Sequence, residues 1–187
     1  MIPFELTEPI ETERLRLRLM TEADIDIVHS YQSREDVCRY LLFDPRDRDT
    51  VAAKVAEHIR HTRLESDGDY LQLAVERKDD GQMIGDLYIT VKSVENDTAE
   101  LGWTFHPDHH GQGYATESAK ALLALAFDTV EFHRVIAELD PRNDASVNLC
   151  LRLGMRREAH FVEDLWFKGE WADTGSYAML AREYRAS

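Results

Sequence analysis

Apolar and polar residues alternate along several short stretches of this chain, and each alternation predicts a β-strand with one buried face. Leucines alternate with arginines over residues 14–19. The same period of two recurs in the middle of the chain at 70–77, 83–94 and 98–106. Asp79-Asp80-Gly81 is a typical turn sequence between the first two of these three strands, so we expect an antiparallel meander.

Other stretches repeat their apolar residues at the spacing of an amphipathic helix. Thr21 and Asp24 predict a cap for a helix that runs to about Tyr31. The remaining helices are predicted at 48–65, from the end of the 109–117 segment to about Val130, and at 144–153, where Gly154 can end the helix. Further strands are predicted at 133–140, 161–167 and 176–184.

Length and composition favour one folding unit. The chain has 187 residues, of which 43% are hydrophobic, and this is the size of an ordinary domain with a sizeable core. No repeat, low-complexity tract or linker interrupts the order of predicted elements. We therefore expect a single domain that spans residues 1–187.

The chain is acidic, with 36 Asp and Glu residues against 22 Lys and Arg residues and a formal net charge of −14. This balance argues against nucleic acid as a partner and favours a cationic or neutral one. The first residues lack the basic and apolar regions of a secretory signal, and the longest apolar run, 121–127, is too short to cross a bilayer. We therefore expect a cytoplasmic protein with no membrane partner.

The cysteines and histidines show no metal-binding pattern. Cys38 and Cys150 have neither the spacing of metal ligands nor the number needed for a disulfide framework, so we expect two buried thiols. His109 and His110 are adjacent, so their side chains project apart, and no third ligand follows at helical spacing. The sequence therefore predicts no metal.

The segment 109–117, His-His-Gly-Gln-Gly-Tyr-Ala-Thr-Glu, lies between a predicted strand and a predicted helix. Without side chains at Gly111 and Gly113 the backbone can approach a ligand closely, and the N–H groups of the first helical turn can point at its anionic oxygens. The Lys and Ser or Thr of a P-loop do not follow Gly113, and the third glycine of a dinucleotide fingerprint is missing. The segment therefore indicates a phosphate site of another kind, although a lone Gly-x-Gly also occurs in simple turns.

Two motifs, together with the order of elements, carry a family resemblance. Gly111-Gln112-Gly113-Tyr114-Ala115 matches the end of a Q/R-x-x-G-x-G/A pyrophosphate motif and continues as Ala115-Thr116-Glu117. Asn143-Asp144-Ala145-Ser146 begins 30 residues after Gly113, a separation that one helix and one strand require, and Leu153-Gly154 follows it. On these residues the chain resembles the GNAT superfamily of acyl-CoA-dependent N-acetyltransferases over nearly its whole length, and in particular the branch of RimJ and RimL.

This resemblance implies an α/β (α+β) fold, with a mixed, mostly antiparallel split β-sheet flanked by helices on both faces and acetyl-CoA held in the split. The implied reaction transfers an acetyl group from acetyl-CoA to a primary amine by direct attack. The amine is either a protein N-terminal α-amine or part of a small molecule, and homodimers are frequent in the family. The implied cofactor contacts are Phe105, His106, His110, Gly111, Gln112, Gly113, Tyr114, Ala115, Thr116 and Asn143.

Two residues are candidates for the chemistry. Glu100 is a carboxylate on an otherwise apolar strand, and in the resembling family a Glu there often serves as general base, directly or through water. Its alternative role is an ion pair with an arginine of a neighbouring strand. Ser146 can donate to the CoA sulfur, as proposed for the RimL-like branch, or bond its own backbone at the start of a helix. Asn143 is predicted to cap that helix and to contact the pantetheine.

The chain departs from the family pattern at three positions. His110 stands where the motif usually has Gln or Arg, so contact with the pyrophosphate there would involve backbone N–H groups. Cys150 stands where many relatives have the tyrosine that protonates the departing thiolate, and Met155 replaces a phenylalanine. Two alternatives to an acetyltransferase remain open: an inactive acyl-CoA-binding sensor or regulatory domain, and a transferase that uses a longer donor such as succinyl-CoA.

Overall fold

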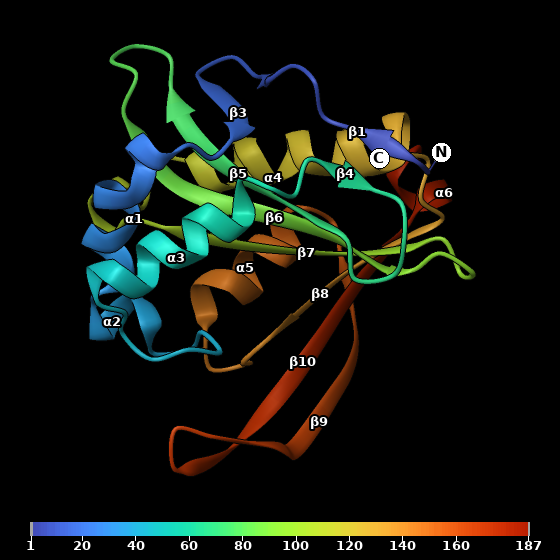
Figure 1. Ribbon diagram of the computed structural model, residues 1–187. Helices are drawn as coiled ribbons and strands as arrows, with labels where there is room; N and C mark the ends of the chain where they lie inside the picture. Colours follow the sequence, from blue (N-terminus) through green and yellow to red (C-terminus); the bar gives the residue numbers. More distant parts are fainter. Residues whose placement is uncertain (1, 187) are drawn as a thin grey trace.

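The computed structural model describes residues 2–186, so the first and last positions of the predicted 1–187 domain lie outside the described residues. Its centre is a mixed sheet with the strand order β2-β3-β5-β6-β7-β8-β10-β9, in which the pairing of β7 with β8 is parallel and the other pairings are antiparallel (Figure 1). Strands β1 and β4 form a separate two-stranded sheet. The strands are β1 Phe4–Glu5, β2 Ile10–Glu11, β3 Leu15–Leu19, β4 Arg63–Leu64, β5 Tyr70–Arg77, β6 Met83–Ser93, β7 Thr98–Phe105, β8 Arg134–Leu139, β9 Arg156–Phe167 and β10 Glu170–Leu180.

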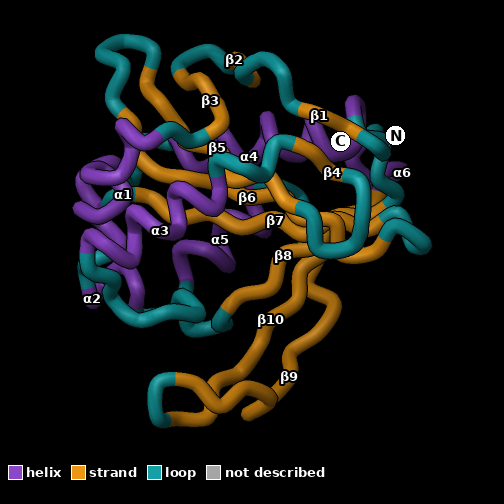
Figure 2. The backbone as a smooth tube through the Cα atoms, in the orientation of Figure 1, coloured by secondary structure: helices purple, strands orange, loops and turns teal. Residues whose placement is uncertain are grey.

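Helices cover both faces of the large sheet (Figure 2). The helices are α1 Ile25–Gln32, α2 Glu35–Cys38, α3 Arg48–His58, α4 Tyr114–Ala124, α5 Asp144–Arg152 and α6 Ala181–Tyr184. Helices α1 and α3 pack on one face, and α4 and α5 pack on the other. The predicted α/β (α+β) architecture, with a mixed, mostly antiparallel sheet between helices, is confirmed.

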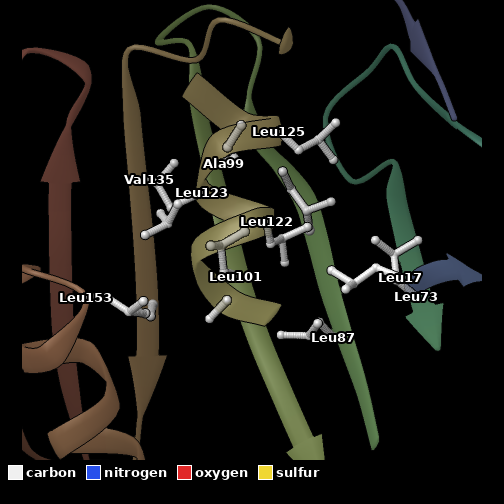
Figure 3. Packing of buried hydrophobic residues seen from close by; sticks show 14 of the residues in the cluster. Leu17, Leu73, Leu87, Ala99, Leu101, Leu122, Leu123, Leu125, Val135 and Leu153 are labelled. Carbon is white, nitrogen blue, oxygen red and sulfur yellow. The ribbon is translucent and has the colours of Figure 1, made fainter. Parts of the chain in front are cut away.

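The larger core lies between the sheet and α4 (Figure 3). Leu122 and Leu123 of α4 are buried together with strand residues such as Leu73 and Leu87. The next residue of β5, Ala74, belongs instead to the smaller core under α1 and α3, because successive strand residues point to opposite faces. Each buried leucine contributes roughly 1.5 to 3 kcal/mol, so this packing fixes α4 and the glycine-rich turn that precedes it.

The sheet splits between β7 and β8. Parallel pairing joins residues 98–100 of β7 to residues 134–136 of β8 and stops there. Residues 101–105 and 137–139 continue as strands that pair with their outer neighbours, β6 and β10. The predicted split is therefore confirmed. The glycine-rich turn follows one diverging strand end, and α5 follows the other.

Some predicted boundaries are confirmed, but one helix is shorter than predicted. Strand β5 spans the predicted 70–77, and Gly154 ends α5 with a φ of +83°. The predicted helix 48–65 is wrong at its C-terminal end, because α3 ends at His58 and Arg63–Leu64 pairs with β1. Leu64 is fully buried through this long-range pairing, which a local helical spacing cannot reveal.

The C-terminal third also differs from the prediction. Strand β9 begins at Arg156 and β10 at Glu170, so they form a long hairpin that projects beyond the rest of the sheet (Figure 1). Most of β9 is exposed, so the alternation that marks a half-buried strand is missing there. The predicted strand 176–184 ends as α6, and the helix expected to reach Val130 passes into a wide π-helical turn at Leu125–Thr129. Within residues 2–186, no helix has the length and apolar character needed to cross a membrane.

Candidate active site

The glycine-rich turn forms the N-terminus of α4. Gly111 and Gly113 have φ values of +73° and +82°, in the left-handed region that favours glycine. Gly113 is the N-cap residue, so the backbone N–H groups of the first helical turn have no acceptor within the helix. A Cβ atom on Gly111 would meet no atom within 4 Å, so the surface is open there. The turn therefore presents N–H donors and the positive end of a helix dipole to an anionic group.

Arg14, the residue before β3, braces this turn. Its guanidinium donates to the carbonyl oxygen of Gln112 at 3.1 Å and to Glu117 at 2.7 Å. It also lies over the ring of Tyr114, 4.6 Å from the ring centroid. Arg14 is not among the predicted site residues, because nothing local in the sequence links it to a turn about a hundred residues later. These contacts hold the turn in one conformation, so an anion meets donors that are already ordered.

A cavity of about 1010 Å³ lies against the turn. The predicted cofactor contacts that line it are Phe105, His110, Gly111, Gly113, Tyr114, Ala115, Thr116 and Asn143. Lys120 and Arg152 line it as well, and Arg152 donates to the hydroxyl of Thr116 at 3.3 Å. Backbone N–H groups with two cations suit the phosphates of a CoA molecule, and the volume leaves room for a bulky ligand.

Two predicted cofactor contacts, His106 and Gln112, do not line this cavity. The His106 ring accepts a hydrogen bond from the backbone N–H of Asp108 at 3.2 Å and so caps the short 3₁₀ turn that follows it. The side chain of Gln112 donates to the carbonyl oxygen of Asp108 at 3.4 Å. Both side chains therefore stabilise the turn through hydrogen bonds to the backbone of Asp108. The ring of His110 lies 3.2 Å from the carbonyl oxygen of Phe105, which fastens the turn to the end of β7.

A second cavity, of about 440 Å³, opens on the sheet face that carries α1 and α3. Glu100 lines it with a side chain that is 14% exposed. Lys92 donates to one carboxylate oxygen at 2.8 Å, and the hydroxyl of Tyr88 donates to the other at 3.2 Å. The cation beside Glu100 is thus a lysine of β6 and not an arginine. The remaining lone pairs of this carboxylate can accept from an amine or a water.

Asp86 is a second carboxylate of this cavity, and it is not among the predicted site residues. It is 4% exposed and accepts hydrogen bonds from the hydroxyl of Tyr31 and, at 2.5 Å, from the amide of Gln72. Burial raises the pKa of Asp86 to about 6, against the lowering effect of these hydrogen bonds. The signal that could have found it is the one that marks Glu100, a carboxylate within an otherwise apolar strand.

The two cavities share a wall at the split between β7 and β8. The residues that line both are Tyr40, Leu41, Trp103, Thr104, Asn143 and Ser146. The indole N–H of Trp103 donates to Ser146 Oγ at 3.1 Å across the split. Because an indole N–H is only a donor, the serine oxygen accepts here and its hydroxyl proton can point at another atom. Asn143 accepts from the N–H of Ser146 at 3.2 Å, so the predicted helix cap is confirmed.

The thiols lie away from this wall. Cys38 and Cys150 are fully buried, which confirms the expected buried thiols. Burial raises the pKa of Cys150 to about 12, and this residue lines neither cavity. A thiol with that environment does not stand in for an acid at the shared wall. Among the described residues, no group of three or more His, Cys, Asp or Glu side chains is arranged to hold a metal ion.

Comparisons with known proteins agree with this geometry. The family model of the acetyltransferase (GNAT) domain matches residues 14–156. An uncharacterized N-acetyltransferase of Bacillus subtilis, YnaD, is 31% identical over 94% of this chain and 98% of its own. A GNAT-family acetyltransferase structure from Bacillus anthracis is 29% identical with a TM-score of 0.85, over 94% of this chain and 99% of that one. A spermidine N-acetyltransferase from Vibrio cholerae, in complex with CoA and spermine, shares the fold with a TM-score of 0.79 at 20% identity, over 93% and 99% of the chains.

Proposed function

The chain belongs to the GNAT acetyltransferase family and is an N-acetyltransferase, and we propose that it moves the acetyl group of acetyl-CoA to a primary amine by direct attack at the wall shared by its two cavities. The contact of Trp103 with Ser146 across the split carries this proposal. Both residues line the cavity beside the glycine-rich turn and also the cavity that contains Glu100. A thioester and an amine that enter from these two sides meet there, which supplies the proximity that acyl transfer needs.

Acetyl-CoA supplies an activated thioester when it is bound. We assign its pyrophosphate to the backbone N–H groups at Gly111 and Gly113, with Lys120 and Arg152 as neighbouring cations, and its pantetheine to Asn143. The other proposed contacts, which line the same cavity, are Phe105, His110, Tyr114, Ala115 and Thr116. The proposed roles of His106 and Gln112 are indirect, through the conformation of the turn.

Glu100 is the proposed general base. It lines the cavity of about 440 Å³, which we assign to the amine acceptor and call the acceptor cavity. The Glu100 carboxylate accepts hydrogen bonds from Lys92 and Tyr88. An α-amine with a pKa of about 7.7 to 8 loses its proton near neutral pH at a cost under about 1.4 kcal/mol, whereas a lysine amine near 10.4 costs roughly 4 to 5 kcal/mol. For an α-amine, a carboxylate acting through one water is therefore sufficient.

Ser146 is the proposed donor to the departing sulfur. Trp103 occupies one lone pair of the serine oxygen, so the hydroxyl proton can be directed at the sulfur. The residue lies in the first turn of α5, where the helix dipole favours negative charge. Since a thiol has a pKa of about 8.5, a hydrogen bond to the leaving thiolate is enough and full proton transfer is not required.

For the acceptor, we propose a protein N-terminal α-amine, as in the branch of RimJ and RimL, or a small-molecule amine. The spermine in the Vibrio cholerae relative supports the second class. The net charge of −14 attracts a protonated amine of either class. We further propose that residues 1–187 act as one cytoplasmic domain.

The test is thiol release from acetyl-CoA across a panel of amines: peptides with free N-termini, lysine peptides with blocked N-termini, polyamines and aminoglycosides. We expect one class to respond and its product to carry the mass of an acetyl group. Silence across the panel with both acetyl-CoA and succinyl-CoA, together with CoA binding by calorimetry, would contradict the transferase proposal and favour an acyl-CoA sensor.

A further inference from the structure

The acceptor cavity contains cations that no carboxylate neutralises, although the chain as a whole is acidic. Several of its charged side chains are paired: Glu100 and Glu138 with Lys92, and Asp140 and Glu170 with Arg142. Among the described residues, three cationic side chains that line this cavity have no carboxylate oxygen within 4.0 Å: Arg39, Arg46 and Lys168. His58, which also lines it, is neutral at pH 7, because burial lowers its pKa to about 4.

Arg46 is the most enclosed of these three cations. Its guanidinium stacks on the ring of Phe43, 3.6 Å from the centroid, and donates to the side-chain oxygen of Gln32 at 2.9 Å. Partial burial lowers its pKa, since the charge has lost water without gaining a salt bridge. A guanidinium in this state gains more from an anionic ligand than a fully hydrated one does, and its planar fork matches a carboxylate or a phosphate.

Arg39 and Lys168 join Arg46 from two other segments. Lys168, in the turn between β9 and β10, donates to the backbone carbonyl oxygen of Cys38 at 2.6 Å. This bond ties the tip of the hairpin to the end of α2, directly beside Arg39. Loop 39–47 and the hairpin tip therefore supply the cations, and both segments lie outside the sheet.

Two acidic groups that line the same cavity come from the central strands of the sheet. Glu100 lies on β7 and Asp86 on β6, in the floor formed by the central strands. Asp86 attracts Arg46 across the cavity, but no salt bridge joins the two among the described contacts. Asp140, directly after β8, and Glu170, at the start of β10, are paired with Arg142. The cavity therefore has an acidic floor on the central strands and a cover with three unpaired cations. A ligand that matches both parts carries a positive and a negative group.

We propose that Arg39, Arg46 and Lys168 form an anion subsite in the acceptor cavity, and that the acceptor is a primary amine that also carries a carboxylate or phosphate group. This inference rests on the proposed amine acetylation and specifies its acceptor. The amine nitrogen bonds to the acetyl carbon as the carbon–sulfur bond breaks, and one amine proton passes to Glu100. CoA departs as a thiolate that accepts a hydrogen bond from Ser146, and bulk water protonates it as Glu100 releases its proton to solvent. The anionic group takes no part in the bond changes and orients the acceptor against the cover.

Two other occupants fit these cations less well. The phosphates of CoA have their own cations, Lys120 and Arg152, in the other cavity, which Arg39, Arg46 and Lys168 do not line. A polyamine would place a second ammonium beside three like charges, and this repulsion weakens binding.

The test measures binding separately from turnover. The protein saturated with CoA is titrated by calorimetry with four compounds of equal chain length: an alkylamine, a diamine, an ω-amino carboxylate and an ω-amino phosphonate. At least one anionic compound should bind about tenfold or more tightly than the alkylamine, as a hydrogen bond to a charged group allows. The last two compounds distinguish a carboxylate from a phosphate. A diamine that binds as tightly as both anionic compounds, or more tightly, would overturn the proposal.

Matched variants locate the subsite. Arg46→Gln and Lys168→Met should each reduce the ratio of the affinity for the anionic compound to the affinity for the alkylamine. The expected reduction is about tenfold for Arg46→Gln. Arg185→Gln removes the same charge from an exposed arginine outside both cavities and should keep the ratio. A merely structural defect lowers both affinities together and leaves the ratio unchanged. If Arg46→Gln fails to fold, Lys168→Met still decides, because Lys168 lies in an exposed turn.

Turnover distinguishes this inference from the proposed function. Anion preference in binding without acetyl transfer to any amine would contradict the function and leave the subsite in place. Acetyl transfer to simple amines with no anion preference, in either wild type or variants, would confirm the function and overturn the subsite.

Discussion

The cavity beside the glycine-rich turn, which we call the donor cavity, shares a wall with the acceptor cavity, but the groups that recognise the two substrates come from different parts of the chain. The anion-binding part of the donor cavity is one continuous segment, where the positive φ values of Gly111 and Gly113 turn backbone N–H groups toward a ligand. The acceptor cavity depends on side chains from β6, β7, loop 39–47 and the β9–β10 hairpin. Donor recognition is thus fixed by local backbone geometry, whereas acceptor recognition is fixed by which distant segments the fold brings together.

Gly113→Val should have the largest effect, and only on the donor side. Its φ is +82°, and a Cβ atom there would lie 3.4 Å from the guanidinium of Arg14. The side chain would cover the N–H donors, and a β-branched residue at this φ adds strain of about 1 to 3 kcal/mol. We expect CoA affinity, measured by calorimetry, to fall by about 100-fold or more.

Gly68→Val is the matched control for that variant. Gly68 has a similar φ of +88°, meets no atom within 4 Å, and lines neither cavity. It should lower stability in urea unfolding and leave CoA affinity unchanged. An equal loss of affinity in both variants would mean that backbone strain, and not the donors at Gly113, explains the effect.

Glu100→Gln should act on the acceptor side alone. Removing a general base lowers turnover by about 100-fold or more at pH 7, and CoA affinity should stay the same. Glu138→Gln is the control, because Glu138 lines the same cavity and lies 3.6 Å from the same Lys92. Turnover by Glu100→Gln that matches wild type across the pH range would remove Glu100 as the base.

Ser146→Ala should have a smaller effect, and it tests the wall that the cavities share. Losing one hydrogen bond to the leaving sulfur should lower turnover by about tenfold, equally for every amine. Trp103→Phe keeps the serine but removes the N–H that orients it, so its loss should be smaller still. These rates are measured at saturating acetyl-CoA. Unchanged turnover in Ser146→Ala would show that the thiolate leaves without this hydroxyl.

Asp86→Asn should change stability more than turnover. Burial raises the pKa of Asp86 from its ordinary 3.8 to about 6, so the folded protein binds this proton more tightly than the unfolded chain does. The stability it confers is present at low pH and is lost as the pH rises from about 4 to about 6, by up to roughly 3 kcal/mol. Asparagine resembles the protonated acid. In urea unfolding, the free energy of unfolding should therefore fall less between pH 4 and pH 7 for the variant than for wild type. Equal decreases in the two proteins would contradict the raised pKa of Asp86.

The contrast between the cavities also explains what the sequence could predict. The glycine-rich turn, the Asn143 cap and the Gly154 stop are local signals, because each depends on the φ or the hydrogen bonds of a few neighbouring residues. The central strands are equally local, since one buried face imposes a period of two. The anion-binding turn of the donor cavity follows from these signals, whereas Arg14, which braces it from a distant segment, does not.

The acceptor cavity depends on contacts that no local pattern reports. Lys168 and Cys38 are 130 residues apart and meet only because the hairpin folds across the end of α2. Asp86 gains its partner Tyr31 in the same way, from a helix 55 residues earlier in the chain. The exposed β9 gives no alternation to mark its length. Prediction from the sequence therefore found Glu100 on this side but missed Asp86 and the three unpaired cations.

Initial rates over a grid of acetyl-CoA and amine concentrations test most directly whether donor and acceptor occupy their cavities together and react at the shared wall. We predict double-reciprocal lines that intersect, because both substrates must be bound before the acetyl group moves. Parallel lines, with acetylated protein formed from acetyl-CoA alone, would show a covalent intermediate and contradict direct transfer.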